Sequence, residues 1–307
     1  MGQEIPKNSV FIRNMRKMNN LIQLIDEKLD EFLQIEYPQN LFKSMKYTVT
    51  LPGKRLRPVL CLEICRLLGG EMEDAIPCAC AIEMLHAQTL IHDDLPCMDN
   101  DDFRRGKPSN HKVFGDAVAT LAGDALLTFA PEIIAKYSQN LSPSTIIRVL
   151  NEYFNYAGAR GVIAGQVVDI ESERNTNIKN KEETLDYIHI HKTSDLFKLA
   201  MRTGAIIAGA SDEKLALVTE FAQKFGLAFQ ICDDILDEIS SFEEMGKTIG
   251  KDKEEGKLTY TSLYGLEQAK CKLVCLLDEC CDIMNKHNIK SDIINDIIEK
   301  MKKRAGV

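Results

Sequence analysis

Apolar residues at helical spacing constrain this chain of 307 residues more than any other feature of its sequence. Residues 18–33, for instance, place Leu21, Ile25 and Leu29 on one face of a helix. Similar patterns recur along most of the chain, whereas the alternation of apolar and polar residues that is typical of strands is essentially absent. The predicted fold class is therefore all-α.

Prolines, glycines and cap residues divide the chain into further helices. Pro58 suits the first turn of one helix, and Gly69 with Gly70 suits its end. Others are predicted over residues 73–93, 116–136, 144–170 (two helices), 185–208, 263–287 and 291–302. A further long helix, capped by Asp212, is predicted between residues 208 and 263. Since no segment has the composition of a linker, we expect one domain over residues 1–307, with residues 1–12 as a disordered N-terminal segment.

Charge and cysteine content narrow the function classes. A net charge of −8 argues against a nucleic-acid partner, and no apolar run approaches the ~18 residues of a membrane span. Ten cysteines without a CxxC pair indicate a reducing compartment, so a cytoplasmic protein is expected. Cys61 with Cys65, and Cys271 with Cys275, could ligate zinc, but no histidine pair accompanies them and core packing is the favoured interpretation.

The acidic stretch HDDLPCMDNDDFRRGKP follows the predicted helix that ends at Asp93. Pro96 interrupts the helix, so a loop could return Asp99 to Asp93. Two carboxylates at one point repel each other, and a hard divalent cation such as Mg²⁺ usually compensates them. Arg104 and Arg105 follow, which suggests a phosphate held between metal and guanidinium. A solvated acidic helix end is the alternative.

A second acidic group favours the functional interpretation. Asp233 and Asp237 are four residues apart on one predicted helix, and Gln230 lies one turn earlier on the same stripe. Elsewhere Lys54, Arg55 and Arg57 precede a helix N-terminus, which already attracts anions. An anion site and a solvated basic turn explain that basic group equally well.

Taken together, several motifs resemble those of the trans-isoprenyl diphosphate synthases, in the same order from about residue 40 onward: GKRLRP, HDDLPCMDNDDFRRGKP, GQVVDIESE, HKTSDLF, FQICDDILD and GKTIGKDKEEGKLTYTSLYGLE. They are most similar to the bacterial and plastid branch, which makes geranylgeranyl or farnesyl diphosphate. The resemblance implies a helical bundle around a central deep cavity, usually as a homodimer. It also makes the plastid stroma the expected location if the source is photosynthetic.

The resemblance assigns roles residue by residue. Three magnesium ions would be held by Asp93, Asp99 and Asp233, with Asp94, Asp234, Asp237 and Lys192 completing the predicted catalytic set. The allylic diphosphate would be held by Arg104, Lys192, Thr193, Gln230, Lys247 and Lys257. Isopentenyl diphosphate would be held by Gly53, Lys54, Arg57, His86 and Arg105.

The implied chemistry explains these residue types. Breaking the C–O bond of an allylic diphosphate (dimethylallyl, geranyl or farnesyl) leaves an allyl cation and a highly charged leaving group. Catalysis is then mainly charge stabilisation at the diphosphate, together with positioning of the double bond of isopentenyl diphosphate. No enzyme nucleophile is required, and we nominate no side-chain base.

Two residues depart from the family pattern. Pro52 stands where the family commonly has the first glycine of GGKR, which stiffens the anion turn. Asp195 stands where a small neutral residue is common. Its carboxylate would either weaken diphosphate binding at Thr193 or point away from it.

A class I terpene cyclase and a non-catalytic partner subunit are the alternatives to a chain-elongating synthase. A cyclase has no use for the second basic group, and a non-catalytic subunit would not need intact acidic motifs. The product length should depend on Gln88 and Thr89, five and four residues before Asp93. Neither is aromatic, so the 20-carbon geranylgeranyl diphosphate is favoured over the 15-carbon farnesyl diphosphate, unless a facing helix near Leu126 or Phe129 supplies the floor.

Overall fold

The computed structural model describes residues 18–174, 178–239 and 257–307. Its elements are, in chain order, α2 (Met18–Phe32), α3 (Gln39–Val49), α4 (Leu56–Leu67), α5 (Met72–Asp93), β1 (Phe103–Arg104), β2 (Lys107–Pro108), α6 (Asn110–Phe114), α7 (Asp116–Tyr137), α8 (Pro143–Ala157), α9 (Val162–Arg174), α10 (Lys181–Ile188), the π-helix η1 (His189–Ser194), α11 (Asp195–Ile207), α12 (Asp212–Ile239), α15 (Tyr260–Tyr264), α16 (Leu266–Lys286) and α17 (Asp292–Ala305). The all-α prediction is confirmed.

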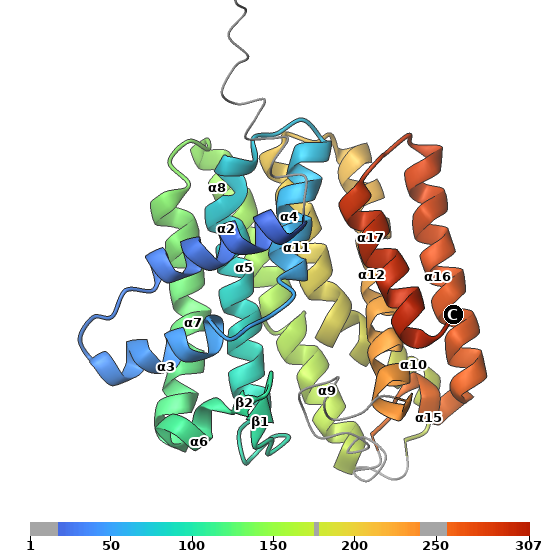
Figure 1. The fold of residues 1–307 in the computed structure, drawn as a ribbon, viewed down its shortest axis with the longest axis horizontal. Coiled ribbons are helices and arrows are strands. Elements are labelled where there is room, and N and C mark those ends of the chain that lie inside the picture. Colours follow the sequence, from blue (N-terminus) through green and yellow to red (C-terminus); the bar gives the residue numbers. More distant parts are fainter. Residues whose placement is uncertain (1–17, 175–177, 240–256) are drawn as a thin grey trace, which may run out of the picture.

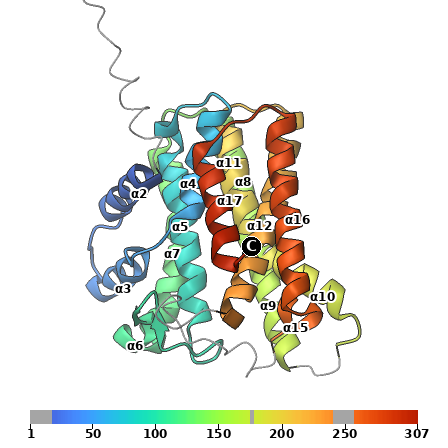
Figure 2. The same cartoon turned by 45° about the vertical axis from the view of Figure 1, so that its right-hand side comes forward.

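The long helices stand side by side as a bundle, and α2 crosses the bundle at a steep angle (Figure 1). In its centre α5 packs against α4, α7 and α11, while α11 also packs against α12 and α8. The pair α16 and α17 covers α12 on one side, as the turned view shows (Figure 2). Both α4 and α5 are buried on nearly every face, which explains why their sequences are apolar all round rather than in one stripe.

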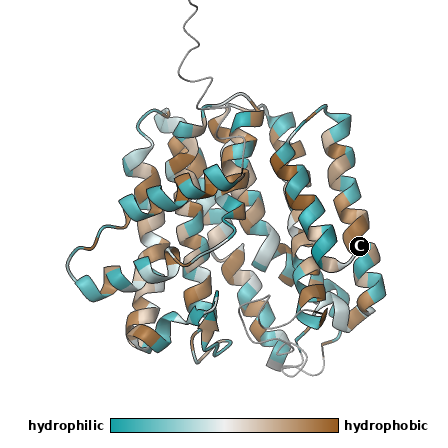
Figure 3. Cartoon of the chain, viewed as in Figure 1, coloured by the Kyte–Doolittle hydropathy of each residue, from teal (hydrophilic) through white to brown (hydrophobic). Residues whose placement is uncertain are grey.

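The outer helices, in contrast, are amphipathic. In α2, Leu21, Ile25 and Leu29 are buried while the charged residues between them face solvent. Figure 3 shows the same separation of apolar and polar faces on α2, α16 and α17. One continuous cluster of buried apolar residues extends from α2 to α17. This core holds the ends of α5 and α12 in fixed positions.

Most predicted helices are present with small changes at their ends, but several details differ. The helices α3 and α6 and the hairpin of the two-residue strands β1 and β2, paired antiparallel, were not predicted. The single helix predicted over residues 185–208 is divided by η1 into α10 and α11. Ser211 rather than Asp212 caps α12, because its Oγ accepts a hydrogen bond from the backbone N–H of Lys214 at 3.4 Å. Residues 1–12, expected to be disordered, lie outside the described residues.

Ten free thiols agree with the expected reducing compartment. Cys61 and Cys65 are buried in the core, and burial raises the pKa of the Cys65 thiol to about 12, so packing explains that pair. For Cys271 and Cys275 the packing interpretation is wrong, because both are exposed on α16. In the described ranges, no three His, Cys, Asp or Glu side chains are grouped so that they could hold a metal ion by themselves.

In the part of the chain that the structure describes, α7 has the length and apolar composition of a membrane span. It packs against α5, α3, α6 and α8, and such a composition is also expected of a core helix in a water-soluble bundle. We therefore attach no membrane role to it.

Candidate active site

The ends of α5 and α12 meet at a polar cavity of about 190 Å³. Its lining includes Asp93 and Asp99 from one acidic group and Asp233, Asp234 and Asp237 from the other. The loop after α5 folds back as predicted, because the backbone N–H of Asp99 donates to the carbonyl of Asp93 at 2.9 Å. The structure thus brings both acidic groups to one place.

Arg104 and Arg105 point in opposite directions. Arg104 lines the polar cavity and forms ion pairs with Asp94 and Asp101, its Nε donating to Asp94 Oδ1 at 3.0 Å. Arg105 turns instead to the carbonyl of Leu51, to which its Nη1 donates at 3.2 Å. Asp94 is therefore used to orient Arg104 rather than to face the cavity directly.

Lys192 and Asp169 form an ion pair in the wall of the polar cavity, with Nζ and Oδ2 2.5 Å apart. Asp169 belongs to the GQVVDIESE motif, and sequence reasoning gave it no role. The pKa of Asp93 is raised to about 6, mainly by burial; Lys192 and Arg104 lower it, whereas the charges of Asp99 and Asp169 raise it. The polar cavity is therefore densely negative, and Lys192 is one of the cations in its wall.

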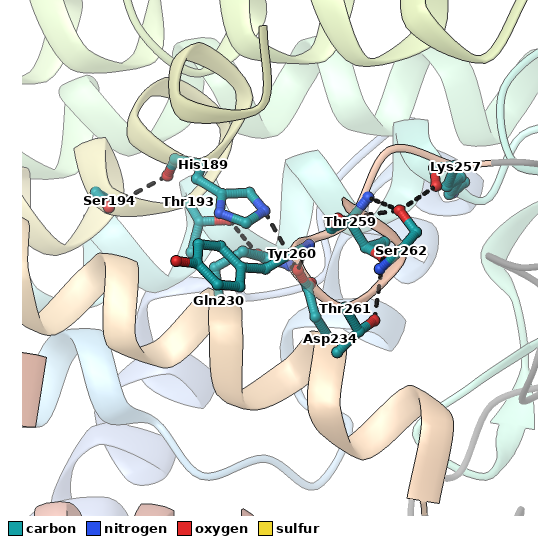
Figure 4. Close-up of polar contacts among 10 residues, drawn as sticks. All are labelled: His189, Thr193, Ser194, Gln230, Asp234, Lys257, Thr259, Tyr260, Thr261 and Ser262. Carbon is teal, nitrogen blue, oxygen red and sulfur yellow. Dashed lines mark hydrogen bonds and ion pairs between the residues drawn. The ribbon is translucent and has the colours of Figure 1, made fainter. Parts of the chain in front are cut away.

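Asp234 has a different environment from its neighbour Asp233. Its Oδ1 accepts from Gln230 Nε2 at 2.8 Å, and its Oδ2 accepts from the backbone N–H of Tyr260 at 2.8 Å. The Nε2 atom of His189 lies 3.4 Å from the same Oδ2 (Figure 4). Burial alone would raise the pKa of Asp234, but His189 and these hydrogen bonds lower it, so the carboxylate stays charged as a buried anchor between α12, η1 and α15.

This anchor extends to the residues predicted for the allylic diphosphate. Thr193 Oγ1 donates to Gln230 Oε1 at 2.5 Å, so Gln230 bridges Thr193 and Asp234 (Figure 4). Lys257 also lines the polar cavity, where its Nζ lies 3.5 Å from Asp99 Oδ1 and 3.3 Å from Glu173 Oε1. Lys247, the remaining member of that predicted set, lies outside the described residues.

Of the basic group near α4, Arg55 is structural. It is buried, with Nε 2.7 Å from Asp26 Oδ1 and Nη1 2.7 Å from Glu83 Oε1. Arg57 is buried over the ring of Phe197, 4.6 Å from its centroid, and its Nε has no hydrogen-bond partner. Only the first of these two arginines is neutralised by direct ion pairs among the described residues.

The other members of the predicted isopentenyl diphosphate set surround Arg57. The Nδ1 atom of His86 is buried without a hydrogen-bond partner, and burial together with Arg57 and Arg105 lowers the pKa of His86 well below its usual value. A Cβ at Gly53 would lie 2.8 Å from Arg105 Nη1, so glycine lets that guanidinium pack against the turn. Lys54 is exposed beside it. Buried, unpaired donors of this kind favour an anionic ligand.

A second, mainly apolar cavity of about 360 Å³ adjoins the polar one, and Asp93, Lys192 and Thr193 line both. Gln88 and Thr89 line it as expected. On the facing helix α7 the lining residues are Asp124 and Leu127, whereas Leu126 is fully buried in the core and Phe129 packs against Phe42. None of the described lining residues is Phe, Tyr or Trp.

Asp195 does not face either cavity. Its Oδ2 lies 2.8 Å from His191 Nδ1, and its Oδ1 lies 2.8 Å from Lys198 Nζ. The carboxylate is therefore compensated inside the protein. Of the two outcomes considered for Asp195, the structure supports the one in which it points away from the diphosphate residues.

Known proteins resemble the chain over most of its length. The profile of the family described as polyprenyl synthetase matches residues 38–301. Geranylgeranyl pyrophosphate synthase 7, chloroplastic, from Arabidopsis thaliana is 49% identical over 246 residues, covering 80% of this chain and 71% of that protein. A dimethylallyltranstransferase from Fischerella ambigua is 46% identical over 255 residues, covering 83% of this chain and 73% of that protein.

Solved structures agree with this match. An FPP/GFPP synthase from Zymomonas mobilis has a TM-score of 0.83 and 32% identity, and the alignment covers 95% of this chain and 99% of that one. A geranyltransferase from Helicobacter pylori, complexed with magnesium and isoprenyl diphosphate, has a TM-score of 0.82 and 30% identity with 98% of each chain covered. The sequence, the all-α fold and the paired acidic helix ends lead to one conclusion: this chain belongs to the polyprenyl synthetase family.

Proposed function

We propose that this trans-prenyltransferase condenses isopentenyl diphosphate with an allylic diphosphate and that its main product is geranylgeranyl diphosphate. The observation that carries the proposal is the apolar cavity that opens beside Asp93 and has no aromatic residue in its described lining. A growing prenyl chain needs such a space next to the site of ionisation. Several similar proteins bear the name geranylgeranyl synthase, which supports the same product length.

Magnesium fits the donor set of the polar cavity. Asp93, Asp99 and Asp233 offer only hard carboxylate oxygens, as Mg²⁺ prefers. These oxygens are spread around the cavity rather than gathered at one point, which suits a metal whose coordination is completed by diphosphate oxygens. Bound there, magnesium would neutralise the charge that develops on the departing diphosphate. Three ions remain the expected number.

Two groups of residues would then each bind one of the two substrates. Lys192, Thr193, Gln230, Lys257 and Arg104, all in the lining of the polar cavity, would hold the allylic diphosphate, and Lys247 is assigned to the same group. Arg57 and His86, with Arg105, Lys54 and Gly53, would hold isopentenyl diphosphate on the other side of Asp93. A neutral His86 suits this role, because its ring can donate a hydrogen bond to an anion without needing a proton from solvent.

We further propose a homodimer and a single catalytic domain. Six exposed large hydrophobic side chains belong to the consecutive helices α7, α8 and α9, and the last two also line the apolar cavity: Leu121, Tyr137, Ile147, Phe154, Ile163 and Val167. Exposed apolar residues gathered on neighbouring elements are typical of an interface. The large subunit of a heterodimeric geranylgeranyl pyrophosphate synthase from Arabidopsis thaliana is 48% identical to this chain, so a complex with a different partner chain is the alternative to a homodimer.

The cytoplasm remains the expected location, with the plastid stroma as the alternative.

The test is a product assay with purified protein, magnesium, dimethylallyl diphosphate and labelled isopentenyl diphosphate. A linear 20-carbon diphosphate is expected, and chelation of magnesium should abolish its formation. A product that stops at 15 carbons with every starter would identify a farnesyl diphosphate synthase instead. A cyclic hydrocarbon, or no product, would contradict chain elongation.

A further inference from the structure

His92 links two helices through the wall of the apolar cavity. Its Nε2 lies 3.0 Å from the backbone carbonyl of Thr120 on α7, and its Nδ1 lies 3.1 Å from Gln88 Nε2 on α5. A carbonyl can only accept, so Nε2 carries the proton and Nδ1 accepts from the Gln88 amide. The imidazole therefore holds the carboxamide of Gln88 in one direction.

Gly123 provides the space for this ring. A Cβ at position 123 would overlap the His92 imidazole, so α7 must have glycine here for the ring to reach the Thr120 carbonyl. The ring also lies 3.8 Å from the carboxylate of Asp124, which has a largely exposed side chain. A larger residue at position 123 would therefore force the His92 ring to move, and this ring lines the apolar cavity.

Gln88 and His92 both line the apolar cavity. Thr89, the other residue predicted to affect product length, does not join the network, because its Oγ1 donates to the carbonyl of His86 at 2.8 Å. Across the cavity lining, Gln166 on α9 has a buried Nε2 without a hydrogen-bond partner. We expect a Gln88 carboxamide released from His92 to turn into the cavity toward Gln166, because leaving a buried amide without a hydrogen bond costs free energy.

We propose that His92 is a positioning residue for product length, holding the Gln88 side chain against the cavity wall through a contact that Gly123 makes possible. The inference rests on the proposed function, in which this cavity houses the growing prenyl chain. The loss of His92 frees the amide, which then obstructs the cavity and favours a shorter product. If the Gln88 amide is removed in addition to His92, nothing obstructs the cavity.

A double-mutant cycle tests this with magnesium, dimethylallyl diphosphate and isopentenyl diphosphate. His92→Leu should lower the ratio of 20-carbon to 15-carbon product about fivefold, which corresponds to about 1 kcal/mol. Gln88→Leu alone should leave the ratio within about twofold, and the double variant should restore it. Equal ratios in His92→Leu and in the double variant, or no shift in His92→Leu, would overturn the proposal.

Gly123→Ala tests the same contact with His92 unaltered. It should shift the ratio in the direction of His92→Leu, and Gln88→Leu in the Gly123→Ala background should cancel part of that shift because no amide is left to obstruct the cavity. Thr120→Ala is the matched control, since it keeps the backbone carbonyl and loses only a hydroxyl that donates to Asp116 O. A shift as large in Thr120→Ala as in Gly123→Ala would contradict the inference.

The product of the wild-type protein shows whether the proposed function or this inference has failed. A wild type that makes 15 carbons refutes the proposed product, and the cycle is then scored on the ratio of 15-carbon to 10-carbon product. Loss of elongation in the wild type refutes both. Thermal unfolding and the rate of the first condensation, measured for every variant, show whether a change in ratio arises from positioning rather than from damage to the neighbouring Asp93.

Discussion

Adjacent aspartates on α12 have different surroundings. Both line the polar cavity, but Asp233 is half-buried, whereas Asp234 is 4% exposed and accepts hydrogen bonds from a side chain and from the backbone of another segment. A carboxylate whose lone pairs are already used by protein donors is a poor metal ligand. We therefore expect Asp233 to be the better ligand of the two.

Asp233→Asn should reduce turnover at least about 10²-fold with little change in stability, since it removes a charge from the cavity wall. Asp234→Asn should instead lower the free energy of unfolding by about 1–3 kcal/mol, because an amide cannot accept both bonds and places an N–H against a donor. Steady-state kinetics and thermal unfolding of both variants distinguish the roles. Unaltered turnover in Asp233→Asn would refute the metal assignment.

The two predicted diphosphate sites can be distinguished by replacing one basic residue of each. Arg57→Ala should raise the KM for isopentenyl diphosphate much more than the KM for the allylic substrate, because Arg57 has a free Nε in the second cavity. Lys192→Ala should do the reverse. Arg66→Ala is the control, since Arg66 lies on the same helix as Arg57 but pairs with Glu63. Equal effects of Arg57→Ala on both substrates would mean that the sites are misassigned.

At the scale of elements, α5 ends at Asp93, a proposed metal ligand, and forms one wall of the apolar cavity. In the proposed function, residues one turn before Asp93 therefore lie where a growing chain would pass. From α7, Asp124 and Leu127 line the same cavity. We therefore expect chain length to depend on the α5–α7 pair rather than on one residue.

Gln88→Phe should shorten the main product, because an aromatic ring would fill the cavity just beyond Asp93. Leu127→Phe should act in the same direction from the facing helix. Leu126→Phe is a contrasting variant, since that side chain is fully buried in the core and overpacking there costs roughly 1–3 kcal/mol of stability. Chromatography of the products checks all three, and an unchanged 20-carbon product from Gln88→Phe would refute the α5 assignment.

The π-helix η1 carries Lys192 and Thr193 into the cavity, and Asp195 holds the first turn after it through His191 and Lys198. Asp195→Ser should leave the KM for the allylic substrate within about twofold, because the carboxylate is already compensated. It should lower the free energy of unfolding by about 1–3 kcal/mol, since Lys198 loses its buried partner. A large improvement in allylic affinity would show that the Asp195 charge does act on the diphosphate.

For the whole molecule, the exposed apolar side chains Leu121, Ile147 and Phe154 on α7 and α8 are a feature without an explanation inside one chain. If they form the homodimer interface, Phe154→Asp should convert a dimer to a monomer, as measured by sedimentation velocity. Tyr37→Asp is the control, because Tyr37 is 92% exposed and lies between α2 and α3. A wild type that sediments as a monomer would refute the homodimer and favour a different partner.

Local chemistry allowed much of this protein to be read from its sequence. Helical periodicity, Pro58 and the glycines after α4 depend on neighbouring residues, so the long helices and the all-α fold were predictable. The acidic groups could be assigned to helix ends for the same reason. The helix α3 was not predicted although it spans 11 residues, and it packs against the distant helices α5 and α7. The hairpin of β1 and β2 could not be predicted, because strands of two residues are too short to show an alternating pattern.

Only the tertiary structure determined which of two neighbouring side chains faces a cavity and which is held inside the protein. Asp234 differs from Asp233, Arg55 from Arg57 and Leu127 from Leu126 through burial and through partners far away in the chain, and no local pattern contains those partners. The contact of His92 with Thr120 and Gly123 depends likewise on how closely α5 and α7 approach. Residues three or four apart on a helix share a face by geometry alone, but what that face meets is determined by the packing of the whole bundle.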